Sequence, residues 1–396
     1  MRSFLTLFFS LSICYSIGQN LFNNQSPFPS DTSNKNKVYH FSNIHFGSTH
    51  FKLALPLKFY TGGFITNDNK GKATPFDRTN ISGGIIDLNV GGIIFNKNKL
   101  IDGWYVNVNW LQSTALKYPQ GLFNAIMYGN SNIENTINLS NLSGHLRNHH
   151  KLSFGFFKSN WTYGLTVGSI NKEITGNFNT NSSILFLPPY EWNIQLNGNI
   201  NSTNISTNSF SSNGISIGGD IIYKSTFNEK WNFSIGLNNF GLISFNKNNP
   251  IYSIDTALNF TGFQWEELRN IDSSIANYTS SFDTTYAKNY TVITPFTIAA
   301  NSQFKLKSIF IYSNLKYIHM SQGNYSLSIG GYKKINNNIL IGSGINYHSI
   351  STFQWEFFTY YQKEKANIGI KLNNLIGIIP NIGKSFGLQT YISWRL

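Results

Sequence analysis

Long segments in which every second residue is apolar recur along most of this chain. One such segment is GWYVNVNWLQ, which begins at Gly103. In it, Tyr105, Asn107 and Asn109 stand between apolar residues. A period of two is typical of a β-strand whose faces meet different surroundings. Many such segments reach about 9 to 11 residues, the length of a tilted transmembrane strand, whereas most strands have about five or six. After the N-terminus no stretch approaches the ~20 apolar residues of a membrane helix. If this chain enters a membrane, it does so as strands.

The composition excludes several other classes of protein. Aromatic residues make up 16% of the chain and charged residues only 12%, which is about half the usual share of charge. Polarity comes instead from Asn, Ser, Thr and Gly, so the chain resembles neither an acidic disordered protein nor a soluble helical one. The net charge is +13, but Lys and Arg are scattered singly or in pairs. Nucleic-acid binding would need them clustered on one face.

The N-terminus, MRSFLTLFFSLSICYSIGQN, has the features of a secretory signal peptide. Arg2 precedes an apolar stretch, and small residues stand near Gly18. We expect a signal peptide at 1–18, an N-terminal extension at 19–50 and a single barrel domain at 51–396. Cys14 is the only cysteine. A lipoprotein signal that uses Cys14 is the alternative, although bulky Ile13 stands where such signals have a small residue. A mature chain cut at residue 18 contains no disulfide and no thiolate.

The strand signals predict an all-β, antiparallel transmembrane β-barrel. Short turns rich in Asn and Gly separate the segments, and glycines inside them suit a curved wall. At roughly 22 to 25 residues per strand and turn, the chain accommodates about fourteen strands, in line with the even numbers of bacterial barrels. The last ten residues, GLQTYISWRL, alternate to the end of the chain. We therefore expect the last strand to pair with the first. Its predicted lipid-facing residues are Leu388, Ile392, Trp394 and Leu396, and its predicted lumen-facing residues are Gln389, Ser393 and Arg395.

Two segments interrupt the strand pattern and predict one or two short helical insertions. Tyr118 to Asn130 spaces apolar residues as one helical face, and Phe263 to Tyr278 holds much of the scarce acid. Each is interpreted as either a plug in the lumen or a loop insertion.

No set of residues predicts catalysis, a cofactor or a metal site. His145, His149 and His150 lie near Arg147 without a cysteine or acid pair, and we interpret them as a turn-facing group before a strand. Ser349 follows His348, and we interpret the two as an ordinary strand dipeptide. The sequence contains no G-x-S-x-G motif. The calcium-like loop that contains Asp68 and Asp77 lacks the spacing and the closing Glu of a calcium site. We expect a protein that is not an enzyme.

Two stretches carry a resemblance to a known family. The first, from Gly121 to Asn179, combines a helical segment, a Tyr-Gly-Asn and a strand hairpin; the second runs from Asn213 to Asn248. The positions that carry it are Tyr128, Gly129, Asn130, Trp161, Gly164, Gly168, Gly214, Asp220, Tyr223 and Asn239. With these residues the chain resembles a Bacteroidota family of unknown function (DUF5723). That resemblance implies an outer-membrane barrel similar in style to fatty-acid-transporter barrels and to the PorV and PorP/SprF barrels of type IX secretion and gliding. It implies no catalytic residue.

Two functions remain open from the sequence. The first is passage of small or amphipathic solutes through the outer membrane, with the helix near Tyr118 narrowing the lumen. The alternative is a non-enzymatic scaffold or anchor for a type IX secretion, gliding or surface-attachment complex. The expected partners are outer-membrane lipids, the barrel assembly machinery and a secretion-system or periplasmic protein, with no nucleic acid. Inward positions that mix Asn, Ser, Tyr and Thr with few charges favour the first function.

Overall fold

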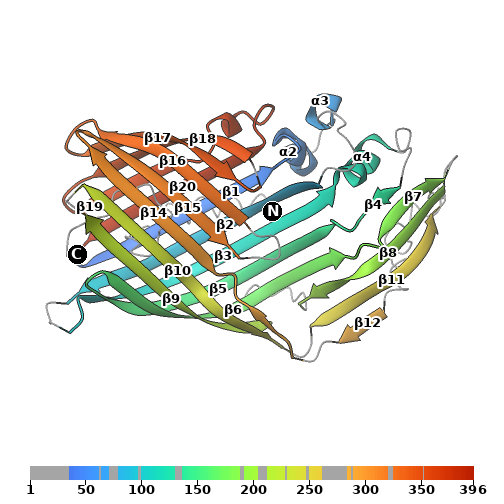
Figure 1. Ribbon diagram of the computed structural model, residues 1–396, viewed down its shortest axis with the longest axis horizontal. Coiled ribbons are helices and arrows are strands. Elements are labelled where there is room, and N and C mark those ends of the chain that lie inside the picture. Colours follow the sequence, from blue (N-terminus) through green and yellow to red (C-terminus); the bar gives the residue numbers. More distant parts are fainter. Residues whose placement is uncertain are drawn as a thin grey trace.

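The computed structural model of the chain is a closed antiparallel β-barrel of fourteen strands (Figure 1). It describes residues 35–396 except for 62–63, 71–78, 97–99, 130–135, 188–190, 204–211, 228–229, 247–248, 261–282, 287–288, 320–323 and 351. The predicted fold class and strand number are confirmed. The wall strands are β1 (Lys37–Ser48), β2 (Thr79–Phe95), β3 (Gly103–Pro119), β5 (Ser143–Lys158), β6 (Trp161–Phe178), β9 (Gly214–Phe227), β10 (Trp231–Phe245), β14 (Thr297–Leu306), β15 (Ile309–Ile318), β16 (Asn324–Lys334), β17 (Ile339–His348), β18 (Thr352–Gln362), β19 (Ala366–Leu372) and β20 (Ser385–Arg395).

The last strand closes the barrel against the first. Every residue of β1 from Lys37 to Gly47 pairs with a residue of β20, in an antiparallel register that runs from Lys37 opposite Arg395 to Gly47 opposite Ser385. The other edge of β20 pairs with β19. Because β1 also pairs with β2, the described wall has no free edge.

The barrel wall begins earlier than residue 51, the start that the sequence predicts. Strand β1 lies inside the segment 19–50, which the sequence predicts as an extension before the barrel. The inward side chains of β1 include Tyr39 and Phe41, both fully buried. The outward positions of β1 place the polar residues His40 and Ser42 between Val38 and Ile44, which weakens the apolar-outward pattern that the other strands show.

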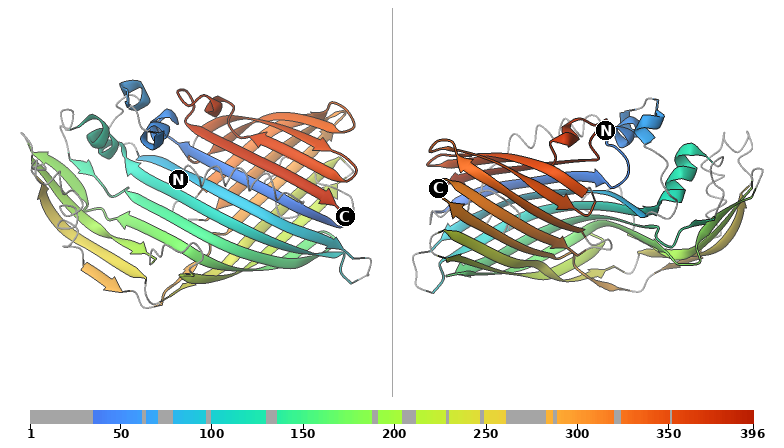
Figure 2. Two further views of the ribbon diagram at one scale, coloured as in Figure 1. Left: turned by 180° about the vertical axis from the view of Figure 1, so that it is seen from behind. Right: turned by 45° about the horizontal axis from the view of Figure 1, so that its top comes forward.

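The two rims of the barrel differ in the length of their connections. We call the rim that holds the start of β1 and the end of β20 the turn rim. The connections at this rim contain two to seven residues, with 159–160 among the shortest and 96–102 the longest. At the opposite rim, the loop rim, lie the four longest connections, 49–78, 120–142, 179–213 and 246–290. Figure 2 shows the helices gathered at the loop rim, away from the C-terminus.

The strands place apolar side chains outside and polar side chains inside. On β3, Val106 and Val108 are 50% and 58% exposed, whereas Asn107 and Asn109 are 7% and 5% exposed. This distribution of apolar and polar side chains is the reverse of that in a soluble protein and is typical of a transmembrane barrel. The prediction for the last strand is confirmed in the same way, because Gln389 and Ser393 are buried while Trp394 is exposed.

Exposed tryptophans form a belt on the outer surface near the turn rim. Trp104 is the second residue of β3, and Trp161 and Trp231 open β6 and β10. Together with Trp394 they are between 43% and 47% exposed. Amphipathic rings at this level match the aromatic girdle where a barrel meets the head groups of lipids.

A side sheet extends the wall beyond the loop rim. It consists of β4 (Ile137–Asn138), β7 (Ser183–Leu187), β8 (Glu191–Ser202), β11 (Pro250–Phe260) and β12 (Asp283–Tyr286). It joins the barrel where the end of β6 pairs with β8 (Figure 1). Because Thr175 pairs with Asn201, the polar face of β8 continues the lumen face of β6. The opposite face carries Trp192 and Ile194.

The helices lie outside the lumen cavities described below. They are α2 (Ala54–Thr61), α3 (Asn67–Lys70) and α4 (Gln120–Tyr128), with one 3₁₀ turn, η2 (Ile376–Ile378). In α4, Phe123 packs on Tyr118 and Leu55, and Ala125 packs on the apolar face of the side sheet. Tyr118 has the same parity on β3 as outward-facing Trp104. The prediction that Tyr118 to Asn130 narrows the lumen is therefore wrong, and the alternative of a loop insertion holds.

The second predicted insertion, Phe263 to Tyr278, lies outside the described residues. In the described part of the chain, no helix is both long enough and apolar enough to cross a membrane.

Removal of residues 393–396 should abolish assembly of the barrel. Ser393 and Trp394 pair with β1 on one side and with β19 on the other, so the deletion opens the seam at the turn rim. We expect the heat-modifiable monomer to disappear from the membrane fraction. The control variant Leu396→Ala changes a residue that is 76% exposed and should assemble. Wild-type yields of folded barrel from the deletion would contradict closure through this seam.

Candidate functional site

Two clusters of inward-facing aromatic side chains narrow the lumen near the turn rim. The first contains Tyr39, Tyr105 and Phe157 with Ile93, all of them buried. The second lies across strands β15 to β20 and consists of Tyr312, Tyr332, Leu340, Phe358, Tyr360 and Tyr391. We call the two clusters together the aromatic floor.

Glycines on neighbouring strands make room for the rings of the aromatic floor. Gly342 pairs directly with Phe358, and the three atoms nearest to a Cβ on Gly342 would all belong to the Phe358 ring. A Cβ on Gly91 would lie 2.6 Å from Cζ of Tyr39, and one on Gly330 would lie 2.5 Å from the Tyr312 hydroxyl. At these positions the absence of a side chain on glycine leaves space for a ring. This role is additional to the prediction that glycines suit a curved wall.

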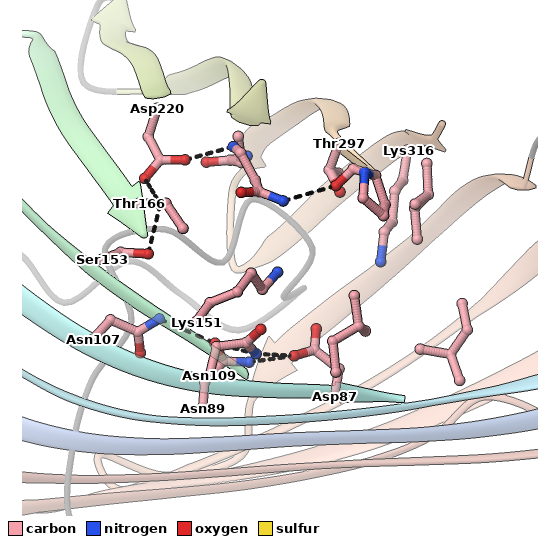
Figure 3. Close-up of a pocket in the computed structure, with 16 residues that line it drawn as sticks. Asp87, Asn89, Asn107, Asn109, Lys151, Ser153, Thr166, Asp220, Thr297 and Lys316 are labelled. Carbon is pink, nitrogen blue, oxygen red and sulfur yellow. Dashed lines mark hydrogen bonds between the residues drawn. The ribbon is translucent and has the colours of Figure 1, made fainter. Parts of the chain in front are cut away.

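Beyond the aromatic floor the lumen contains a cavity of about 110 Å³, which we call the polar chamber (Figure 3). At about 30 Å³ per water molecule in the liquid, it holds a few waters or one small solute. Its lining is dominated by amides, hydroxyls and charges from β2, β3, β5, β6, β9, β10, β14 and β15. The lining residues are Ile85, Asp87, Asn89, Asn107, Asn109, Leu111, Lys151, Ser153, Thr166, Asp220, Asn238, Asn239, Pro295, Thr297, Lys316 and Ile318.

One carboxylate of the chamber is held by an amide network. The Asp87 Oδ1 atom accepts hydrogen bonds from Asn89 Nδ2 at 2.6 Å and from Asn109 Nδ2 at 2.5 Å. Asn107 Nδ2 donates in turn to Asn89 Oδ1 at 3.2 Å. These bonds connect β2 and β3 and fix the Asp87 charge in one position (Figure 3).

The second carboxylate stabilises an irregularity in the wall. Asp220 Oδ1 accepts the backbone N–H of Asn239 at 2.6 Å, and Asp220 Oδ2 accepts the Thr166 hydroxyl at 3.0 Å. Asn239 has a φ of 57° and lies where the register of β10 against β9 shifts. The Asn239 amide donates to the carbonyl of Pro295 at 3.0 Å. Pro295 lies in the break between β13 (Thr291–Ile293) and β14.

Four of the positions that carry the family resemblance contact one another in two pairs. Asp220 and Asn239 lie on different strands of the second resemblance stretch, and the structure places them in direct contact. Trp161 of the first stretch packs against Tyr223 of the second, with ring centroids 4.8 Å apart. These residues act as structural contacts between β6, β9 and β10.

Two lysines bring positive charge into the chamber. Figure 3 shows Lys151 and Lys316 projecting from two different walls, β5 and β15. With Asp87 and Asp220 they give the chamber lining two positive and two negative side chains. The sequence alone does not distinguish these lysines, because each is an isolated inward position on a separate strand.

An ion pair lies farther toward the loop rim. Arg147 donates from Nε and Nη2 to the two carboxylate oxygens of Glu173, at 2.5 and 2.8 Å, and both side chains are largely buried. Tyr290, in the connection before β13, stacks on Phe245 with ring centroids 4.7 Å apart. Burial, and after it the negative charge of Glu173, raises the pKa of Tyr290 to about 12. The Tyr290 phenol is therefore uncharged at neutral pH.

The histidines and acids considered from the sequence are dispersed. His145, His149 and His150 lie within β5, so the interpretation as a turn-facing group is wrong. Among the described residues, no cluster of three or more His, Cys, Asp or Glu side chains could hold a metal ion.

The remaining sequence candidates have structural contacts. Asp68 pairs with Lys52 at 2.9 Å, whereas Asp77 lies outside the described residues. The Ser349 hydroxyl donates to Asn324 at 3.2 Å, and His348 lies beside His45, with ring centroids 4.3 Å apart.

Comparison with known proteins adds a family match and distant structural likenesses. A model of the family of unknown function DUF5723 matches residues 38–389, and no curated protein matches the chain. Among solved structures, a FadL homologue of Pseudomonas aeruginosa is 8% identical, with a TM-score of 0.42 and coverage of 90% of this chain and 89% of that one. The toluene transporter TodX of P. putida is 9% identical, with a TM-score of 0.39 and coverages of 91% and 88%.

An autotransporter is among the similar structures as well. The translocator domain of NalP from Neisseria meningitidis is 6% identical, with a TM-score of 0.36 and coverages of 93% and 90%. At such identities and TM-scores, these likenesses carry no argument about function.

The packing of rings on glycines is testable by substitution and rescue. Gly342→Val should push the Phe358 ring out of place, and overpacking of this kind costs about 1–3 kcal/mol. We expect a lower denaturant midpoint for the barrel folded in detergent. Adding Phe358→Ala should restore part of the loss, because the larger side chain then fills the vacated space.

The matched control is Gly331→Ala on the adjacent strand. A Cβ there would lie no closer than 3.4 Å to the nearest atom, so the midpoint should barely change. Additive effects of Gly342→Val and Phe358→Ala would contradict the proposed packing.

Proposed function

Because the chain belongs to a family of unknown function, its role must come from its own residues, and we propose that it is an outer-membrane channel for small polar or amphipathic solutes. Closed barrels of this kind with short turns at one rim and long loops at the other place the turns in the periplasm and the loops outside the cell. The proposed route therefore runs from the loop rim through the polar chamber to the aromatic floor.

The observation that carries the proposal is the polar chamber itself. Buried amides and charges are costly unless they have partners, and a barrel that serves only as an anchor can fill its lumen with apolar side chains. This barrel instead lines a cavity of about 110 Å³ with carboxylates, lysines and amides. A hydrated, polar cavity inside the wall suits a solute that enters from water.

The aromatic floor is the element that restricts passage. Phe358 is fully buried and packs edge to face on Tyr312, with ring centroids 5.7 Å apart. Rings of this kind limit the diameter of the lumen and give amphipathic solutes an apolar contact. We propose that solutes cross by displacing the floor rings.

The proposed location and partners follow from the barrel. Export by an N-terminal signal, recognition of the terminal strand by the barrel assembly machinery and insertion among outer-membrane lipids are parts of the proposal. The alternative function, an anchor for a secretion or attachment complex, predicts bound partner proteins without solute flux.

Liposome swelling tests the proposal. Liposomes that contain the full chain should admit glycerol faster than protein-free liposomes do. Phe358→Ala should increase the rate severalfold, because it removes a ring from the floor.

The matched control is Phe353→Ala, the same substitution on the same strand but at an outward residue that is 75% exposed; its rate should equal that of the wild type. Swelling no faster than that of protein-free liposomes, in both the wild type and Phe358→Ala, would sink the channel proposal.

A further inference from the structure

A second cavity of about 50 Å³ adjoins the polar chamber and shares Lys316 with it. Its charged and titratable lining residues are two lysines and two histidines, and none of its described lining residues is Asp or Glu. The lining residues are Asn43, His45, Ile85, Asn314, Lys316, Ile318, Asn324, Ser326, Ser328, Asn346, His348, Lys371, Asn373 and Gln389. The polar chamber, which Lys316 also lines, differs because Asp87 and Asp220 are part of its lining.

One lysine of this cavity, Lys371, is held in place by an ion pair with a buried carboxylate. The Lys371 ammonium lies 2.7 Å from Glu356 Oε2, with exposures of 3% and 0% for the two side chains. Tyr312 donates its hydroxyl to the other oxygen of Glu356. The ion pair with Glu356 holds Lys371 in position, and an ammonium has three N–H donors, so donors remain for the cavity.

Buried amide groups around the cavity have no partner in the protein. Each side chain is more than nine-tenths buried, and buried polar atoms nearly always have a hydrogen-bond partner. The atoms concerned are Asn43 Oδ1, Asn314 Nδ2, Asn346 Oδ1, Asn373 Oδ1 and Gln389 Oε1. The set contains one donor and four acceptors. A molecule that satisfies them must offer hydrogen-bond donors as well as an acceptor.

We propose that this cavity binds a small organic anion that also carries hydroxyl or amino groups. The carboxylate of such a solute meets Lys316 and Lys371, and its donors meet the acceptor oxygens of Asn346, Asn373 and Gln389. The inference rests on the proposed channel function for the route by which the solute arrives, and it assigns that channel a class of substrate.

Equilibrium binding to the full chain folded in detergent tests the site. Sodium lactate, a small hydroxy acid, is the probe, and lactamide at equal ionic strength is its neutral counterpart. Lactate should raise the melting temperature of the barrel in a saturable manner, and lactamide should not. Lys316→Gln should weaken lactate binding at least tenfold. Lys316→Arg keeps the positive charge and should therefore retain most of the lactate affinity of the wild type.

The matched control is Lys333→Gln, which removes the same charge at an exposed residue beside the turn rim and should leave binding unchanged. Equal effects of lactate and lactamide, or lactate binding that survives Lys316→Gln, would overturn the anion site. Heat-modifiability establishes that each variant is folded.

Flux separates this inference from the proposed function. Liposomes that pass lactate and lactamide equally, without sensitivity to Lys316→Gln, would support a channel and overturn the anion site. Lysine-dependent lactate binding without flux of either solute would support the site and overturn the channel.

Discussion

The pairing of β1 with β20 is the interaction on which the rest of the structure depends. It runs without interruption from Lys37 to Gly47 and removes the two edges that an open sheet would expose. In a bilayer no water is available for unpaired backbone groups, so only a closed sheet can cross it. Closure also gives each strand one inner and one outer face, which fixes the inward direction of Asn107, Lys316 and the other lumen residues.

Within the closed wall, the lumen is organised into levels. The aromatic floor lies near the turn rim, where Tyr39 and Phe358 rest on glycines of adjacent strands. The polar chamber comes next, followed by the ion pair of Arg147 and Glu173 toward the loop rim. This order places the most apolar of these levels nearest the turn rim. The bulge at Asn239, held by Asp220, sets the shape of the wall at the chamber.

The sequence predicted what depends on local alternation. The barrel class, the strand number and the inward and outward residues of the last strand all follow from a period of two and from strand length. Strand β1 was missed because its large rings point inward while residues such as His40 and Ser42 point to the other face. The side sheet was not distinguished from the wall because its strands alternate like membrane strands. The helix at α4 was recognised, but amphipathicity does not specify which surface it covers.

The site could not be predicted, because its contacts join residues far apart in the chain. Lys151 and Lys316 become neighbours of one cavity only when β5 and β15 are placed around the lumen. Asp220 and Asn239 were singled out by resemblance, but their hydrogen bond depends on the register shift of β10. A single sequence specifies the face of each residue more readily than its neighbours on that face.

Thiol labelling along β3 tests the central claim, that amides face a hydrated lumen and apolar residues face lipid. In a Cys14→Ser background the chain has no other cysteine, so single cysteines can be placed at Val106, Asn107, Val108 and Asn109. A membrane-impermeant thiol reagent applied to the reconstituted barrel should label the two asparagine positions and spare the two valine positions. Equal labelling at all four, or labelling of the valine positions alone, would contradict the account.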